Sequence, residues 1–133
     1  MKHVPQVTGV RNCGQVAVAA LTGASLAAVE YTVGHSHGTK ASELRNALSQ
    51  FGWYSDARCY VKPSGTPFLG LAKLRRADTK HSGSWHWIAM DGEWVYDGHQ
   101  SCPLRLKDYL EAAAIYFGVP VRITSYLRVW RPE

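Results

Sequence analysis

A cysteine, a histidine and an aspartate in this 133-residue sequence could together perform nucleophilic catalysis. Cys13 follows Asn12, a residue type that favours helix N-caps, and opens an apolar, alanine-rich stretch that predicts a helix over residues 13–22. At a helix start the thiol lies in the positive end of the helix dipole, which lowers the thiol pKa and favours the nucleophilic thiolate. The backbone N–H of Cys13 could donate to an oxyanion, and Gly14 would leave room beside the sulfur for a substrate backbone.

The histidine and the aspartate lie on the two sides of a predicted β-hairpin. Asp91-Gly92 between two β-rich runs favours a two-residue type I′ turn, and that turn places His86 directly opposite Asp97. Opposed residues of an antiparallel pair have Cβ atoms about 4.5–5.5 Å apart, a separation that an imidazole–carboxylate hydrogen bond can span. Such a carboxylate orients a histidine and stabilises its protonated form, as a general base requires.

Each of these features also has a structural explanation. A cysteine at a helix start is often a small buried core residue, and a histidine–aspartate pair is often a structural ion pair. The presence of both in one chain favours nucleophilic catalysis. The tryptophans on either side of the histidine, Trp85 and Trp87, could shield the site or form a wall of a substrate groove.

The composition is that of one globular domain spanning residues 1–133, because 46% of the residues are hydrophobic and 19% are charged. No apolar run approaches the roughly 18 residues of a membrane span, and the N-terminus lacks the apolar core of a secretory signal. We therefore expect a cytoplasmic protein without a membrane partner. Three widely spaced cysteines argue against a disulfide scaffold and for reduced thiols.

The formal net charge is +5, but the basic residues are scattered along the chain. This scatter argues against a nucleic-acid partner and leaves two interpretations open, a solvated surface or an acidic partner. His35, His37, His99 and Cys102 match no zinc-binding spacing, so we expect no metal and no other cofactor. The sequence does not indicate the oligomeric state.

The predicted elements are helical in the first half of the chain and strand-rich in the second. Helices are expected over residues 13–22, 25–33, 39–51 and 106–117, and strands over 54–61, 68–74, 85–90, 93–96 and, as one or two strands, 119–130. Helices followed by an antiparallel sheet define an α+β fold.

Three stretches of the chain resemble one family. They are Gln6 with residues 12–23 (NCGQVAVAALTG), residues 38–52, and His86-Trp87-Ile88-Ala89 with Tyr96-Asp97-Gly98. Together they are similar to the papain-like cysteine peptidases, and most similar to the compact branch that includes the bacteriocin-processing peptidases, which cleave leaders after a double glycine. The resemblance covers residues 5–100. The sequence departs from that branch where Asn12 replaces an acidic residue, and where Gln6 lies one residue further from the cysteine.

The resemblance implies a papain-like fold, with an N-terminal helical layer packed on an antiparallel sheet and the active site in the cleft between them. It implies Cys13 as nucleophile, His86 as general base and then acid, Asp97 as the orienting carboxylate, and Gln6 as side-chain donor to the oxyanion. The implied reaction is hydrolysis of a peptide or isopeptide bond in a peptide or protein substrate, through a thioester acyl-enzyme. Two alternatives remain: a deamidase or acyltransferase with the same triad, and a non-catalytic binding module with a basic surface.

Overall fold

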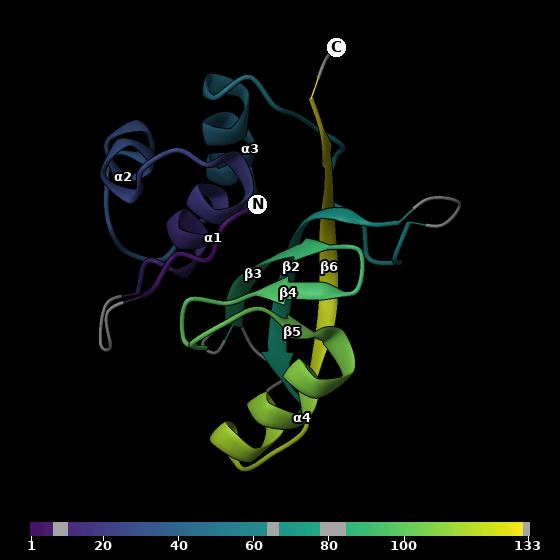
Figure 1. Ribbon diagram of the computed structural model, residues 1–133. Helices are drawn as coiled ribbons and strands as arrows, with labels where there is room; N and C mark the ends of the chain where they lie inside the picture. The colour runs from purple at the N-terminus through teal and green to yellow at the C-terminus, as the bar shows by residue number, and fades with distance from the viewer. Residues whose placement is uncertain (7–10, 64–66, 78–84, 132–133) are drawn as a thin grey trace.

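A computed structural model describes residues 1–6, 11–63, 67–77 and 85–131, with only the backbone of Trp85. Within these residues the protein has four helices and one six-stranded antiparallel sheet, so the predicted α+β class is confirmed (Figure 1). Among the described residues, no helix has the length and apolar character needed to cross a membrane.

The first three helices form a layer on one face of the sheet (Figure 1). They are α1 (Cys13–Thr22), α2 (Leu26–Val33) and α3 (Ala41–Gln50). Helix α1 is buried almost all round and ends at Gly23, whose φ of 79° is the left-handed conformation that glycine adopts at low cost. The Ser25 hydroxyl caps α2 by accepting a hydrogen bond from the Ala28 N–H. Asn12 occupies the N-cap position of α1, as expected, but its side chain makes no capping hydrogen bond. Helix α3 begins at Ala41 with Lys40 as its N-cap, so the helix expected from residue 39, with Thr39 as its cap, starts later than predicted.

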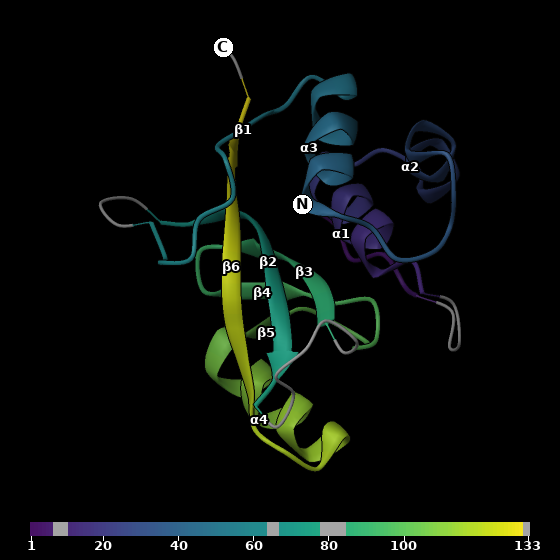
Figure 2. The same cartoon turned by 180° about the vertical axis from the view of Figure 1, so that it is seen from behind.

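The sheet has the strand order β1-β6-β2-β3-β4-β5. Its strands are β1 (Tyr54–Ser55), β2 (Leu69–Arg76), β3 (Trp85–Asp91), β4 (Trp94–Tyr96), β5 (Leu104–Arg105) and β6 (Val121–Trp130). The strand expected over residues 54–61 is reduced to β1 and a single bridge at Cys59, because Tyr54, Tyr60 and Val61 are exposed and provide no buried face. The closing segment is one long strand, which runs the height of the sheet in Figure 2.

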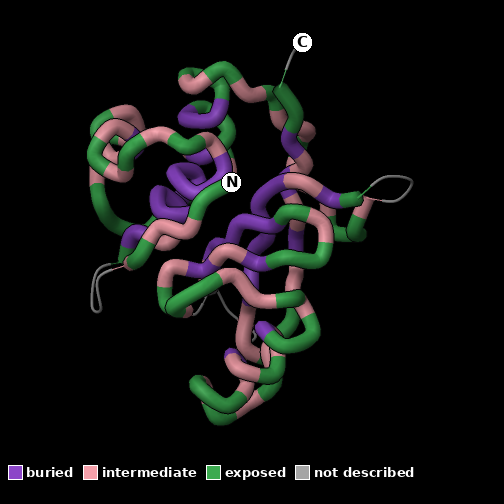
Figure 3. The backbone as a smooth tube through the Cα atoms, in the orientation of Figure 1, coloured by how far each residue is buried: buried purple, intermediate pink, exposed green. Residues whose placement is uncertain are grey.

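Helix α4 (Leu106–Phe117) covers the second face of the sheet, so the protein has three layers (Figure 2). Alternation of side chains along each strand gives each face its own core. Leu71, Trp87 and Ala89 pack under α1–α3, whereas Ile88 and Met90 pack with Tyr109 of α4. Figure 3 shows the buried backbone concentrated in α1 and the central strands.

The hairpin between β3 and β4 differs in register from the sequence prediction. Asp91 pairs with Trp94, so the turn residues are Gly92 and Glu93 instead of Asp91 and Gly92. A type I′ turn needs positive φ at both central residues, but here only Gly92 has it (φ 60°), as a type II′ turn requires at its first central position. The ladder runs from Asp91↔Trp94 to Ala89↔Tyr96. His86 and Asp97 therefore do not face each other directly.

Candidate active site

The start of α1 meets β3 beyond the end of β4. Because the ladder with β4 stops at Ala89↔Tyr96, the backbone N–H of Trp87 has no strand beside it on that side. It donates instead to the Cys13 sulfur, at 3.4 Å. The thiol also forms a side-chain hydrogen bond with His86. Because β4 ends at Tyr96, the edge of β3 next to the imidazole is not paired with β4, and the Cys13 sulfur lies there.

The second ring nitrogen of His86 is held by a carboxylate. His86 Nε2 donates to Asp97 Oδ1 at 2.8 Å, which leaves Nδ1 for the thiol. The two residues still lie on one face, because the register differs by one residue on each strand and the side-chain alternation is preserved. Asp97 is thus a diagonal neighbour of His86, within reach of a long side chain.

Two further donors, one from α4 and one from the loop after β4, fix the carboxylate. The Tyr109 hydroxyl of α4 donates to Asp97 Oδ2 at 2.6 Å, and the His99 backbone N–H donates to Oδ1 at 3.0 Å. The Asp97 side chain is 5% exposed and that of His86 is 14% exposed. Buried polar groups hydrogen-bonded on several sides have little freedom to reorient, so the imidazole is held toward the sulfur.

The charges of the site follow from competition between burial and these contacts. Burial raises the pKa of the Cys13 thiol, but the hydrogen bond and charge of His86, with the Trp87 N–H, lower it below its usual value. Burial lowers the pKa of His86, yet its bonds to Asp97 and Cys13 raise it to about 10. Burial raises the pKa of Asp97, while its bonds from His86 and Tyr109 lower it to about 2. These shifts favour a thiolate next to an imidazolium, and they keep the Asp97 carboxylate ionised at neutral pH.

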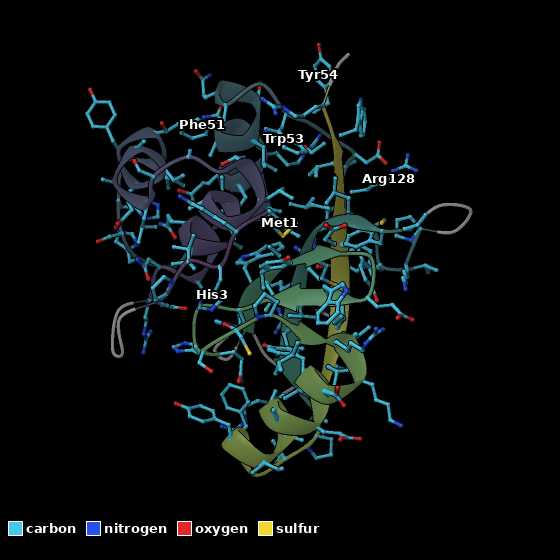
Figure 4. The ribbon with its side chains drawn as sticks, viewed as in Figure 1. Met1, His3, Phe51, Trp53, Tyr54 and Arg128 are labelled. Atoms are coloured by element: carbon cyan, nitrogen blue, oxygen red, sulfur yellow. The ribbon has the colours of Figure 1, made fainter. Side chains whose placement is uncertain are left out.

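The N-terminal segment joins the helical layer to the loop after β4. The Lys2 N–H donates to the carbonyl oxygen of Ala20 in α1, and the Gln6 N–H donates to that of Gly98, both at 3.0 Å. His3, labelled in Figure 4, lies beside this loop with its Nε2 3.2 Å from the Asp97 carbonyl oxygen. A Cβ at Gly98 would lie 2.7 Å from the Gln6 Cβ, so only glycine allows this close approach.

A cavity of about 1000 Å³ opens at the sulfur. Cys13, His86 and Gln6 all line it, so three of the four predicted catalytic residues face one space, and Asp97 supports the histidine from behind. The cavity also takes residues from the loop between α2 and α3, from the end of β2 and from the end of α4: His35, His37, Lys40, Arg75, Arg76, Tyr116 and Phe117.

The expected substrate contacts of Gly14 and Trp87 are wrong. Gly14 is buried, and a Cβ there would overlap the Thr39 Oγ1 and lie 3.0 Å from Leu44 Cδ2. The glycine therefore lets α1 pack against the start of α3 and leaves no space for a substrate. Trp87 is 1% exposed, points into the core under α1, and donates from Nε1 to the Thr39 carbonyl oxygen at 3.3 Å. The predicted contact of the Trp85 side chain lies outside the described residues.

We expect Gly14→Ala to destabilise the fold by about 1–3 kcal/mol, as overpacking of a close-packed core does. Gly38→Ala is the matched control, because a Cβ at Gly38 would meet no atom within 4 Å. Urea unfolding of both variants measures the difference. Thr39→Ala should recover part of the loss in the double variant, since it removes the overlapping hydroxyl. A Gly14→Ala protein as stable as the wild type would show that the packing explanation is wrong.

Two residues of the site were not anticipated from the sequence. Tyr109 bonds the carboxylate from a helix on the opposite face of the sheet. Gln15, fully buried in α1, donates from Nε2 to the carbonyl oxygens of His35 and His37, each at 3.0 Å, and so ties the rim of the cavity to the helix that carries the cysteine. A polar group on the buried stripe of a helix was the available signal in both cases.

Comparisons with known proteins do not add a family to this description. No protein-family model matches the chain, and a search of curated proteins finds no match. The functional assignment therefore depends on the geometry of the site.

Proposed function

We propose that this protein is a cysteine hydrolase of the papain-like type that cleaves peptide or isopeptide bonds. The observation that supports the proposal best is the hydrogen-bonded chain from Cys13 through His86 to Asp97, with the sulfur and the imidazole both facing one cavity. A nucleophile within reach of a base, and a base oriented by a third group, is the arrangement for covalent catalysis.

The reaction proceeds in two stages. The Cys13 thiolate attacks the carbonyl carbon of the scissile amide, and the His86 imidazolium gives its proton to the leaving amine, which leaves a thioester. His86, now neutral, removes a proton from water, and the hydroxide attacks the thioester carbon. The carbon–sulfur bond breaks, the carboxylic acid product is released, and the Cys13 thiolate is restored beside the protonated imidazole. Asp97 keeps the imidazole oriented through both stages.

Charge develops on the carbonyl oxygen in each stage and requires donors. The backbone N–H of Cys13 lies at the start of α1, where helix N–H groups have no intrahelical acceptor. Gln6 lines the cavity beside the cysteine and is held by its backbone bond to Gly98, and we assign its side chain as the second donor. A helical layer that carries the nucleophile and a sheet that carries the base also form the two walls of a papain-like site.

The experiment that tests the proposal is a search for new peptide termini. A proteome digest is incubated with the wild-type protein or with Cys13→Ala, and the products are compared by mass spectrometry. The proposal expects new termini with the wild type alone. A mass increase of about one unit at glutamine or asparagine side chains, without new termini, would instead identify a deamidase with the same residues. No wild-type-dependent change of either kind would contradict a hydrolase and favour a binding module.

Tyr109 is a positioning residue in this scheme, because it contacts Asp97 and not the reacting atoms. We expect Tyr109→Phe to lower the free energy of unfolding by about 2 kcal/mol, the usual contribution of a hydrogen bond to a charged group. It should also lower kcat about tenfold with little change in KM, since substrate binding is not altered. Tyr31→Phe, at an 89% exposed position of α2, is the control for both measurements. A variant with lower stability but unchanged kcat would restrict Tyr109 to a structural role.

A further inference from the structure

The cavity at Cys13 is surrounded by positive charge. Among the described residues that line it, four carry a cationic side chain and one carries a carboxylate: Arg11, Lys40, Arg75, Arg76 and Glu43. Transfer of the Cys13 proton to His86 does not change this balance, because the charges of a thiolate and an imidazolium cancel each other. The wall of the cavity is therefore cationic.

The cationic residues come from three separate elements around the sulfur. Arg11 is exposed two residues before Cys13, and Lys40 is exposed immediately before α3. Arg75 and Arg76 end β2, where the preceding residue, Leu74, pairs with His86. Arg11 and Lys40 therefore place positive charge where the chain enters α1 and where it enters α3.

Glu43, the one carboxylate among the described residues of the lining, is already bound by neighbouring donors. Glu43 accepts from the Lys40 N–H at 2.9 Å and lies 2.6 Å from His35 Nε2, and these contacts lower its pKa. The loop that carries His35 is fastened to α1 by Gln15, and the His35 and His37 rings stack at 3.8 Å. Within the described part of the chain, no ion pair occupies the side chains of Arg11 and Lys40. The loop on this side of the cavity is therefore held in place by hydrogen bonds, and the cationic side chains of Arg11 and Lys40 could bind an anionic ligand.

We propose that the substrate is an acidic peptide, with aspartate or glutamate side chains next to the scissile amide. The inference rests on the proposed function and names the substrate class of the same site. A cleft lined by one sign of charge raises the local concentration of ligands of the opposite sign and their association rate, by about 10-fold or more at low salt. Apolar and aromatic side chains in the same lining, Leu74, Tyr116, Phe117 and Val121, suit an extended peptide better than a polyanion without apolar groups.

Turnover of matched peptides tests the proposal in the first instance. Three peptides of one sequence are compared that carry glutamate, glutamine or lysine on both sides of the scissile bond. We expect kcat/KM to be at least about tenfold higher for glutamate than for glutamine, to be lowest for lysine, and to lose this preference as salt rises, because exposed charges are screened. Equal kcat/KM for the three peptides would overturn the acidic-substrate proposal and leave the hydrolase proposal intact.

A second readout does not depend on turnover. Alkylation of Cys13 by anionic iodoacetate is compared with alkylation by neutral iodoacetamide, and the ratio of rates reports the potential at the sulfur. We expect the double variant Arg11→Gln/Lys40→Gln to lower the ratio of the iodoacetate rate to the iodoacetamide rate several-fold. Lys107 is an exposed residue of α4 that does not line the cavity, so Lys107→Gln should leave this ratio unchanged. The His86 charge is present in all three proteins, so it cannot cause the difference.

The two readouts separate the two proposals. A ratio that falls in the double variant, with no peptide cleaved, would support acidic ligand recognition and contradict the hydrolase. An unchanged ratio in the double variant would overturn the inference. Protection of Cys13 from iodoacetamide by an oligonucleotide at lower concentration than by the glutamate peptide would also overturn it, because the cavity would then prefer a nucleic acid.

Discussion

Cys13→Ala is expected to lower the hydrolysis rate by about 10⁶-fold, because no other group can form the thioester. The side chain lies at the edge of the core under the helical layer and is only partly buried. The free energy of unfolding should therefore change by less than about 1 kcal/mol, a small effect typical of positions outside the packed interior. Progress curves with the cleaved peptide measure the activity, and urea unfolding measures the stability.

Cys102→Ala is the control for this substitution, because Cys102 is exposed and is not among the described residues that line the cavity. It should keep full activity. A Cys13→Ala protein that retains more than about a thousandth of the wild-type rate would contradict covalent catalysis by this residue. Loss of activity in Cys102→Ala would show that the assignment of Cys13 as the nucleophile is wrong.

His86→Gln is expected to cost about as much activity as the cysteine substitution, because the thiolate loses its partner and the leaving amine loses its acid. The midpoint of the pH dependence of Cys13 alkylation should move to higher pH. In the wild type, His86 outweighs the effect of burial and the Cys13 pKa lies below 9.0. Without it, burial and the negative charge of Asp97 raise the pKa and only the Trp87 N–H opposes them, so the thiol should ionise at a higher pH in the variant than in the wild type.

The rate of iodoacetamide labelling of Cys13, followed by mass spectrometry from pH 5 to pH 10, measures this shift. Labelling of Cys102 in the same samples is the internal control and should follow one curve in both proteins. If the Cys13 curve has the same midpoint in the wild type and in His86→Gln, the imidazole does not determine the state of the thiol.

Local signals in the sequence predicted much of the fold. The helix at residues 13–22 is confirmed, because an apolar Ala-rich run is closed by Gly23, and so is α4 over Leu106–Phe117. Helix α2 is confirmed with its Ser25 cap. These elements depend on periodicity and capping within a few residues, which a sequence displays directly.

The register of the hairpin was not predictable from the Asp91-Gly92 pair alone. The dipeptide allows a type I′ turn, but Gly92 at the first central position allows a type II′ turn as well, and the structure adopts positive φ at Gly92 only. The two registers differ by one residue on each strand and keep the same faces. The meeting of His86 and Asp97 was therefore predicted correctly from a register that was wrong.

Contacts between segments that are distant in the chain could not be predicted from the sequence. Tyr109 reaches Asp97 from a helix whose packing face depends on the whole sheet, and Thr39 fills the space at Gly14 from another helix start. Trp87 faces the core because strand β3 is covered on both faces. The side chains of β3 alternate between the two cores, so neither set of side chains points to solvent. The positive lining of the cavity likewise depends on which scattered basic residues the fold brings together.

The most direct test of the ion pair between sulfur and imidazole is an NMR titration of the ¹⁵N-labelled His86 ring, before and after Cys13 is blocked with iodoacetamide. In the free protein the ring should remain protonated to about pH 10. In the alkylated protein it should lose its proton at a lower pH, because the neutral thioether no longer stabilises the imidazolium while Asp97 still does. An identical titration of His86 in the two samples would contradict the account, since the thiol would then have no contact with the base.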